Sequence, residues 1–238
     1  RFEQQNTKFV ELSIQQKPTS QIVSSNFVEA PKVTAVIKQT IVTEILNFNF
    51  IDDQRKAILQ PLVVFIQEKI NRKEVINLNF ICTHNSRRSH LAQIWSQFAS
   101  AYYNIPNINC YSGGTEETAL FPKIVETLEN QGFQILKVAD SKNPIYAIKY
   151  DENSSPIIGF SKKYNDAFNP ISNFAAILTC SQADEGCPFI AGAEKRIPIT
   201  YEDPKISDGT LQQTEIYKQR SIEIATEMMY VFSQIKFN

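Results

Sequence analysis

The sequence predicts an α/β protein with a doubly wound, mostly parallel four-stranded sheet, flanking helices, an N-terminal helical extension and an inserted hairpin. From Val75 onward, short apolar runs alternate with amphipathic stretches, which is typical of parallel strands joined by crossover helices. Residues 174–179 are nearly all apolar, as expected of a strand buried on both faces. A chain of 238 residues is long enough for one substantial core and an extension.

The sequence divides into three parts. Residues 1–37 are polar and rich in Gln, Ser and Asn, which predicts an extension that wraps the body, binds a protein partner or is disordered alone. Residues 38–73 are predicted to be helical and packed on the core, with Asp52 and Asp53 as an N-terminal cap. Residues 74–238 are predicted to form the α/β domain.

The α/β domain contains alternating strands and helices followed by one long helix. Its expected strands are 75–81, 108–112, 133–138 and 174–179, and its expected helices are 89–103, 118–131 and 210–235. The turn-rich residues 151–155 lie between apolar runs and predict the hairpin. Ligands bind at the carboxyl ends of parallel strands, so the loops after Ile81 and Thr179 are the predicted site.

Composition excludes several functional classes. A net charge of -1 gives no reason to expect nucleic acid, and no apolar run approaches the about 20 residues of a membrane helix. The four cysteines are too sparse for a secreted disulfide scaffold and lack a close zinc-binding pair. We therefore expect no metal, and an intracellular location with reduced or catalytic thiols. Residue 1 is Arg, so a cleaved presequence and an organelle such as the mitochondrion stay open.

The loop from Cys82 to Ser89 carries the strongest functional signal. It joins a predicted strand directly to a predicted helix, so backbone N–H groups should converge on an anion there. Arg88 adds a planar fork of donors, and Arg87 supplies a second cation. Cys82, at the base of this cradle, would be a nucleophilic thiolate. The alternative is an inert buried cysteine before a basic helix start.

Two further cysteines follow the strand 174–179. Cys180 comes directly after that strand, and Cys187 lies seven positions later. If the loop closes on itself, a relay from Cys82 through Cys180 to Cys187 would leave a disulfide for an external reductant. Spacing alone does not distinguish this relay from an apolar filler and a surface thiol. Asp203, before Pro204, indicates a turn, or a general acid if that loop covers the cleft.

These motifs together resemble the low-molecular-weight protein tyrosine phosphatase superfamily, and most closely its thioredoxin-coupled arsenate reductases, in the long form with N-terminal helices. The matching positions are Cys82, Thr83, Asn85, Ser86, Arg88, Ser89, Ala92, Trp95, Cys180, Cys187, Asp203 and Pro204. The chain departs from the family at His84, where the phosphatases usually have glycine. It also has Gln93 where a reductase glutamate is linked to potassium binding.

The resemblance implies a role for each matching residue. Cys82 would be the nucleophile, Arg88 the oxyanion clamp, Asp203 the general acid, and Cys180 and Cys187 the redox pair. The other oxyanion-binding residues would be Thr83, His84, Asn85, Ser86, Arg87 and Ser89. Asn85 would also hold the loop, and Ser89 would stabilise the thiolate. The implied substrate is a small oxyanion or a phosphomonoester, with no tightly bound cofactor and with a thioredoxin-like external reductant.

Three functions stay open on the sequence. An arsenate reductase would need Cys82, Cys180 and Cys187. A phosphomonoester or protein tyrosine phosphatase would form a phosphocysteine on Cys82 and would need Arg88 and Asp203, but neither later cysteine. A non-catalytic subunit of a larger assembly would use the fold as a surface, with residues 1–37 as a partner-binding arm.

Overall fold

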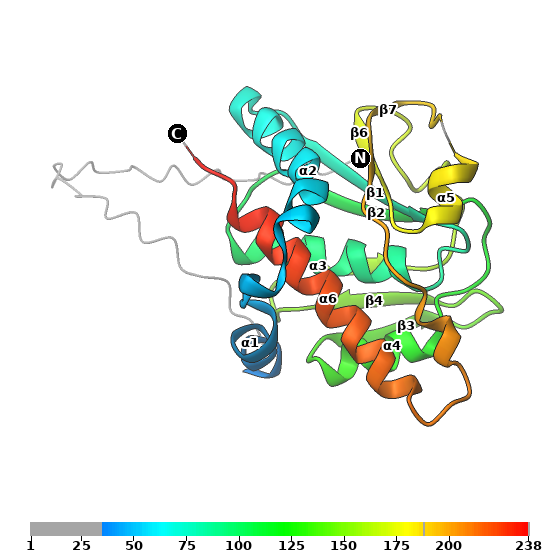
Figure 1. Ribbon diagram of the computed structural model, residues 1–238. Helices are drawn as coiled ribbons and strands as arrows, with labels where there is room; N and C mark the ends of the chain where they lie inside the picture. The colour runs from blue at the N-terminus through cyan, green and yellow to red at the C-terminus, as the bar shows by residue number, and fades with distance from the viewer. Residues whose placement is uncertain (1–34, 188, 238) are drawn as a thin grey trace, which may run out of the picture.

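In the computed structural model, which describes residues 35–187 and 189–237, the chain forms a parallel sheet of four strands and a separate antiparallel sheet of three (Figure 1). Most of the predicted extension, residues 1–37, lies outside these residues. Its role as an arm for a partner, and the boundaries of the three predicted parts, therefore stay predictions.

The main sheet confirms the predicted α/β class. Across the sheet its strands are β2 (Ile108–Gly114), β1 (Ile76–Cys82), β6 (Phe174–Leu178) and β7 (Ala193–Pro198). All of them run parallel, and Ile81 of β1 lies beside Gly113 on one side and Leu178 on the other. The carboxyl ends of β1, β2 and β6 therefore meet at one edge of the sheet, where the functional loop was predicted.

Helices cover both faces of this sheet. The helices that contact its strands are α2 (Asp53–Arg72), α3 (Arg88–Tyr102) and α5 (Ser181–Gly186). Outside them, α6 (Gln213–Ser233) packs on α3, and α4 (Pro122–Asn130) packs on α6. The larger apolar cluster joins α3 and α6 to one face, while α5 packs on the other through Ala183. Side chains of a strand alternate between faces, and β6 is buried along its whole length because Ile177 enters the larger cluster and Leu178 the smaller one.

The segment ahead of the sheet is helical, as predicted for residues 38–73. Its elements are α1 (Ala35–Thr40), η1 (Ile41–Ile45), η2 (Phe48–Phe50) and α2 (Asp53–Arg72). Asp52 is the N-cap of α2, and its Oδ1 accepts a hydrogen bond from the Arg55 backbone N–H at 2.7 Å. The Arg55 guanidinium then pairs with both carboxylate oxygens of Glu227 on α6, at 2.6 and 2.8 Å. This partly buried ion pair fixes α2 against the core.

Among residues 35–187 and 189–237, no helix combines the length and the apolar character that a membrane span requires.

The second sheet confirms the hairpin and corrects the assignment of one strand. Its strands are β3 (Gln134–Ala139), β4 (Ile145–Lys149) and β5 (Ile157–Gly159), all antiparallel. The strand expected at 133–138 exists, but it pairs with β4 rather than with the main sheet. Most residues of β3 are exposed, so it does not suit a sheet covered on both faces. The fourth main strand is β7, which the sequence analysis missed because its Ala-Glu-Lys-Arg-Ile-Pro sequence has little apolar character.

Candidate active site

The loop after β1 is folded as an anion cradle. The carbonyls of Cys82, Thr83 and Ser86 all accept hydrogen bonds from backbone N–H groups of residues 115–121. Within the part of the chain that the structure describes, the backbone N–H groups of residues 83–87 donate no hydrogen bond. Unpaired N–H groups in a loop that leads into a helix N-terminus are suited to a negatively charged ligand.

Cys82 lies at the base of this loop and is 4% exposed. Its Sγ is 3.1 Å from the Ser89 Oγ, which in turn accepts a hydrogen bond from the Asn85 Nδ2 at 2.9 Å. Because Asn85 donates to the serine oxygen, the Ser89 proton is free to point at the sulfur and to stabilise a thiolate. Asn85 has a φ of 44°, in the left-handed region that asparagine tolerates. The predicted roles of Asn85 and Ser89 therefore fit the geometry.

Arg88 and Asp203 meet at the mouth of the site. The Arg88 guanidinium is almost fully buried and donates to the Asp203 Oδ2 at 2.6 Å and to the Tyr201 carbonyl at 2.9 Å. Asp203 also begins a 3-10 turn, η3 (Pro204–Ser207), by accepting from the Lys205 N–H. These contacts join the segment that carries Tyr201 and Asp203 to Arg88, the first residue of α3.

Arg87 does not take the position that the sequence predicted, which was that of a second cation at the bound anion. Its side chain does not join Arg88 at the anion, because the Nε donates to the Tyr217 hydroxyl at 2.7 Å and an Nη donates to Asp208 at 2.8 Å. The guanidinium also lies over the Phe121 ring, 4.0 Å from its centroid. Arg87 therefore connects the loop to α6 and its preceding turn.

Two other predicted ligands also direct their side chains elsewhere. The His84 ring is half-exposed, with its Nε2 3.6 Å from Glu116, and the left-handed backbone is at Asn85 rather than at His84. The Ser86 hydroxyl donates to the Ala119 carbonyl at 2.7 Å. These residues can contribute backbone N–H groups to the cradle, whereas their side chains contact Glu116 and the Ala119 carbonyl.

The later cysteines lie beside the cradle. Cys180 is fully buried, belongs to the same apolar cluster as Cys82, and its Sγ is 3.5 Å from the Thr83 hydroxyl. Cys187 packs against that cluster at the opposite end of α5. Burial raises the pKa of the Cys187 thiol, and the nearby Arg196 partly offsets this effect. All of these thiols are free.

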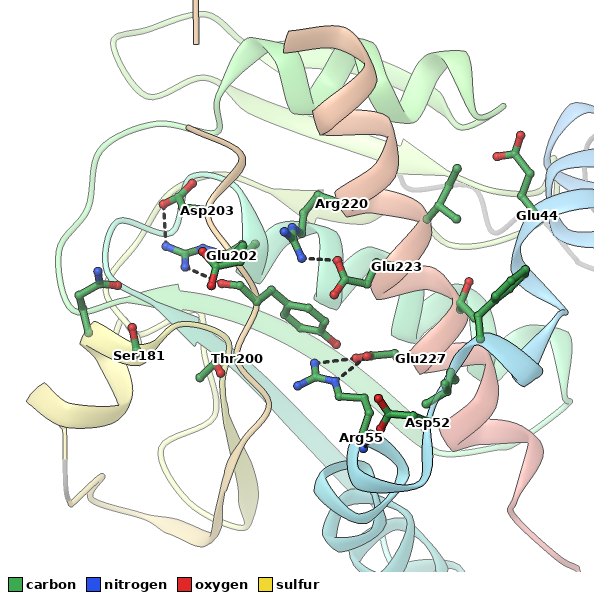
Figure 2. A pocket seen from close by; sticks show the side chains of 17 residues that line it. Glu44, Asp52, Arg55, Ser181, Thr200, Glu202, Asp203, Arg220, Glu223 and Glu227 are labelled. Carbon is green, nitrogen blue, oxygen red and sulfur yellow. Dashed lines mark hydrogen bonds and ion pairs between the residues drawn. The ribbon is translucent and has the colours of Figure 1, made fainter. Parts of the chain in front are cut away.

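A groove of about 750 Å³ extends from this mouth toward the N-terminal helices (Figure 2). Arg88, Asp203 and Ser181 line one part of it, and Arg55 and Glu227 line another. Figure 2 shows the Arg55–Glu227 contact along its wall. The Arg88–Asp203 contact belongs to another part of the lining. No sequence motif indicated this groove, since its walls come from five separate segments.

Gly114, at the end of β2, is required by the close approach of the loop. A Cβ added there would overlap the Glu116 and Thr83 carbonyl oxygens and the Asn85 nitrogen. We expect Gly114→Ala to lower the free energy of unfolding by about 2–3 kcal/mol, because backbone atoms cannot move aside as a flexible side chain can. Chemical denaturation measures this change. Gly186→Ala, where a Cβ meets nothing within 4 Å, is the matched control; because Gly186 is the last residue of α5, it should leave stability unchanged or raise it by up to about 1 kcal/mol.

Comparison with known proteins agrees with this site. No family model matches the chain. It is 29% identical to an arsenate reductase of Staphylococcus aureus strain Newman over 126 residues, which are 52% of this chain and 76% of that protein. It is 25% identical to an arsenate reductase of Bacillus licheniformis over 144 residues, which are 59% of this chain and 83% of that protein.

The solved structures that are similar to the chain include an arsenate reductase and a phosphatase. One is an arsenate reductase in the phosphate-binding state, with a TM-score of 0.44, 16% identity, and coverage of 68% of this chain and 100% of that one. Another is a low-molecular-weight phosphotyrosine phosphatase from Vibrio cholerae, with a TM-score of 0.43, 14% identity, and coverage of 66% and 94%. In its curated matches and its cysteine loop, the chain is thus similar to the superfamily of low-molecular-weight protein tyrosine phosphatases and arsenate reductases.

Proposed function

We propose that the protein is an arsenate reductase that uses Cys82, Cys180 and Cys187 in a thiol relay. The observation that carries the proposal is the placement of Cys82 and Cys180 at the ends of adjacent parallel strands, in one apolar cluster on which Cys187 also packs. A phosphatase requires the first of these cysteines alone. The curated matches, which are arsenate reductases, support the same choice.

The relay transfers two electrons from the thiols to arsenic. The Cys82 thiolate attacks arsenate and forms a sulfur–arsenic bond, and a hydroxyl leaves arsenic as water after protonation. The Cys180 thiolate then attacks the Cys82 sulfur, so the electron pair of the sulfur–arsenic bond stays on arsenic and arsenite departs. Cys187 next attacks Cys180 and releases Cys82 as a thiolate. An external dithiol of the thioredoxin class reduces the remaining disulfide.

The last disulfide requires α5 to unwind. Cys180 and Cys187 are the N-cap and C-cap of this helix. Seven residues of an α-helix advance about 10 Å, whereas the Cα atoms of a disulfide lie within about 7 Å of each other. The hydrogen bonds that join Cys180 to Asp184 and Ala183 to Cys187 must therefore break before this disulfide forms. The short length of α5 keeps this rearrangement local.

Single-turnover release of arsenite tests the proposal. Reduced protein is mixed with arsenate without added thiol, arsenite is quantified, and the disulfides are mapped by mass spectrometry. We expect about one arsenite per protein chain and a Cys180–Cys187 disulfide. Unchanged thiols and no arsenite would contradict the proposal.

A second function is favoured by the position of Asp203 next to Arg88. In a phosphatase, Cys82 would displace the alcohol or phenol of a phosphomonoester, Asp203 would protonate the leaving oxygen, and water would hydrolyse the phosphocysteine. Hydrolysis of an aryl phosphate that depends on Asp203 but is unchanged in Cys180→Ser would identify this activity.

A further inference from the structure

Lys162 is a buried cation that the proposed reaction does not use. It lies just after β5, and its side chain is 1% exposed. Among the described residues it has no ion-pair partner; its Nζ donates to the Phe160 carbonyl at 3.3 Å and lies over the rings of Phe160 and Phe168, at 4.3 and 5.2 Å from their centroids. An ammonium without a paired carboxylate is costly to bury, so its position requires an explanation.

Hydrogen bonds connect Lys162 to the cysteine loop by its backbone. The Lys162 N–H donates to the Asn85 Oδ1 at 2.9 Å, and the Asn85 Nδ2 donates to the Ser89 Oγ, which contacts Cys82. The Lys162 carbonyl accepts from the Gly114 N–H at 2.8 Å, which ties the same residue to the end of β2. The Lys162 backbone therefore fixes the position of Asn85, and Asn85 in turn stabilises the cysteine loop.

A second connection runs through His90, which is fully buried on α3. Its Nε2 is 3.2 Å from the Phe160 carbonyl that also accepts from Lys162, and its Nδ1 is 3.4 Å from the Asn85 Nδ2. An amide nitrogen can only donate, so Nδ1 accepts and Nε2 carries the proton. Burial, together with the nearby Lys162 charge, lowers the pKa of His90 to about 3, so the ring stays neutral.

We propose that Lys162 is a positioning residue whose buried ammonium favours the Cys82 thiolate and the bound oxyanion, while its backbone and the neutral His90 keep Asn85 in place. The proposal rests on Cys82 being the nucleophile of the proposed function. The ammonium reaches the loop through shared contacts, because its Nζ and the His90 Nε2 both approach the Phe160 carbonyl and His90 contacts Asn85. A buried positive charge is little screened by water, so it acts on negative charge at the sulfur and on the ligand from behind these residues.

The charged and titratable groups around this cation are few. His90 faces it from α3, and Asp166 acts on it from the following loop. Burial lowers the pKa of Lys162 to about 8, with Asp166 opposing that shift, so the side chain is mostly charged at pH 7 and neutral well above pH 8. Cys180 lies in the same apolar cluster as Cys82.

Alkylation of Cys82 by iodoacetamide across pH, followed by peptide mass spectrometry, tests the role of Lys162. In Lys162→Met we expect the pH midpoint of Cys82 alkylation to rise by about one pH unit, and the inorganic phosphate concentration that protects Cys82 to rise about tenfold. Lys163→Met removes the same charge from an exposed neighbour and should leave both values unchanged. The difference in phosphate protection from the wild type should shrink as the pH rises well above 8, because the wild-type ammonium then loses its charge.

A second variant separates charge from packing. Lys162→Gln can still donate to the Phe160 carbonyl but carries no charge, so the same upward shift is expected if Lys162→Met does not fold. An unshifted midpoint in either folded variant would overturn the proposal. The assay does not need turnover, so its failure is distinct from failure of the proposed function, which would appear as no arsenite from the wild type.

Discussion

Replacing Cys187 with serine is expected to stop catalysis after one cycle. Cys82 and Cys180 remain, so the protein should still release about one arsenite per chain. It should then accumulate a Cys82–Cys180 disulfide, because no third thiol is present to release Cys82. With thioredoxin present, we expect steady-state arsenite formation to fall by about 100-fold or more.

The control for this experiment is Cys110→Ala. Cys110 is buried on the opposite face of the sheet, in the larger apolar cluster, away from the cluster shared by Cys82 and Cys180. Its removal should leave multiple turnover close to that of the wild type. Full steady-state activity in Cys187→Ser would contradict the relay and would direct attention to the phosphatase reaction.

Replacing Arg88 with lysine is expected to give the second large loss. Arg88 is almost fully buried, and its planar fork can contact two ligand oxygens at once. A lysine retains the charge but not the fork, so we expect kcat/KM to fall by about 10²–10³-fold. Steady-state kinetics with arsenate measure this loss.

Arg87→Lys is a matched control because it makes the same change at the adjacent residue. Arg87 contacts Tyr217, Asp208 and Phe121 instead of the anion cradle. We expect kcat/KM to stay within about threefold of the wild type, with a loss of stability of about 1–2 kcal/mol from the weakened contacts. Equal kinetic losses in the two variants would contradict the assignment of Arg88 alone as the clamp.

The sequence predicted the parallel core because that information is local. The apolar runs that became β1 and β6 are buried on both faces, and such strands have few other stable environments. The motif from Cys82 to Ser89 likewise lies in one continuous segment, so its loop-to-helix geometry followed from order and spacing. β7 and β3 were harder to place because an edge strand and an exposed strand both lack a clear apolar pattern.

The parts that the sequence could not predict depend on distant partners. The local sequence around Arg87 is that of any basic residue at a helix start. Its side chain is oriented by contacts with Asp208 and Tyr217, which are more than 100 residues away in the sequence. Lys162 follows a hairpin and belongs to no motif, so its burial appears only when the loop, α3 and β5 come together. The groove is also a product of packing between separate segments.

The ion pair between Arg88 and Asp203 has a thermodynamic consequence for ligand affinity. An incoming oxyanion competes with the Asp203 carboxylate for the same guanidinium donor. The measured dissociation constant is therefore the intrinsic constant divided by the fraction of molecules in which Arg88 is free. Loss of the carboxylate should tighten anion binding even as it removes the proton donor. In the phosphatase reaction, where Asp203 would be the proton donor, affinity and proton transfer would therefore be opposed at this one residue.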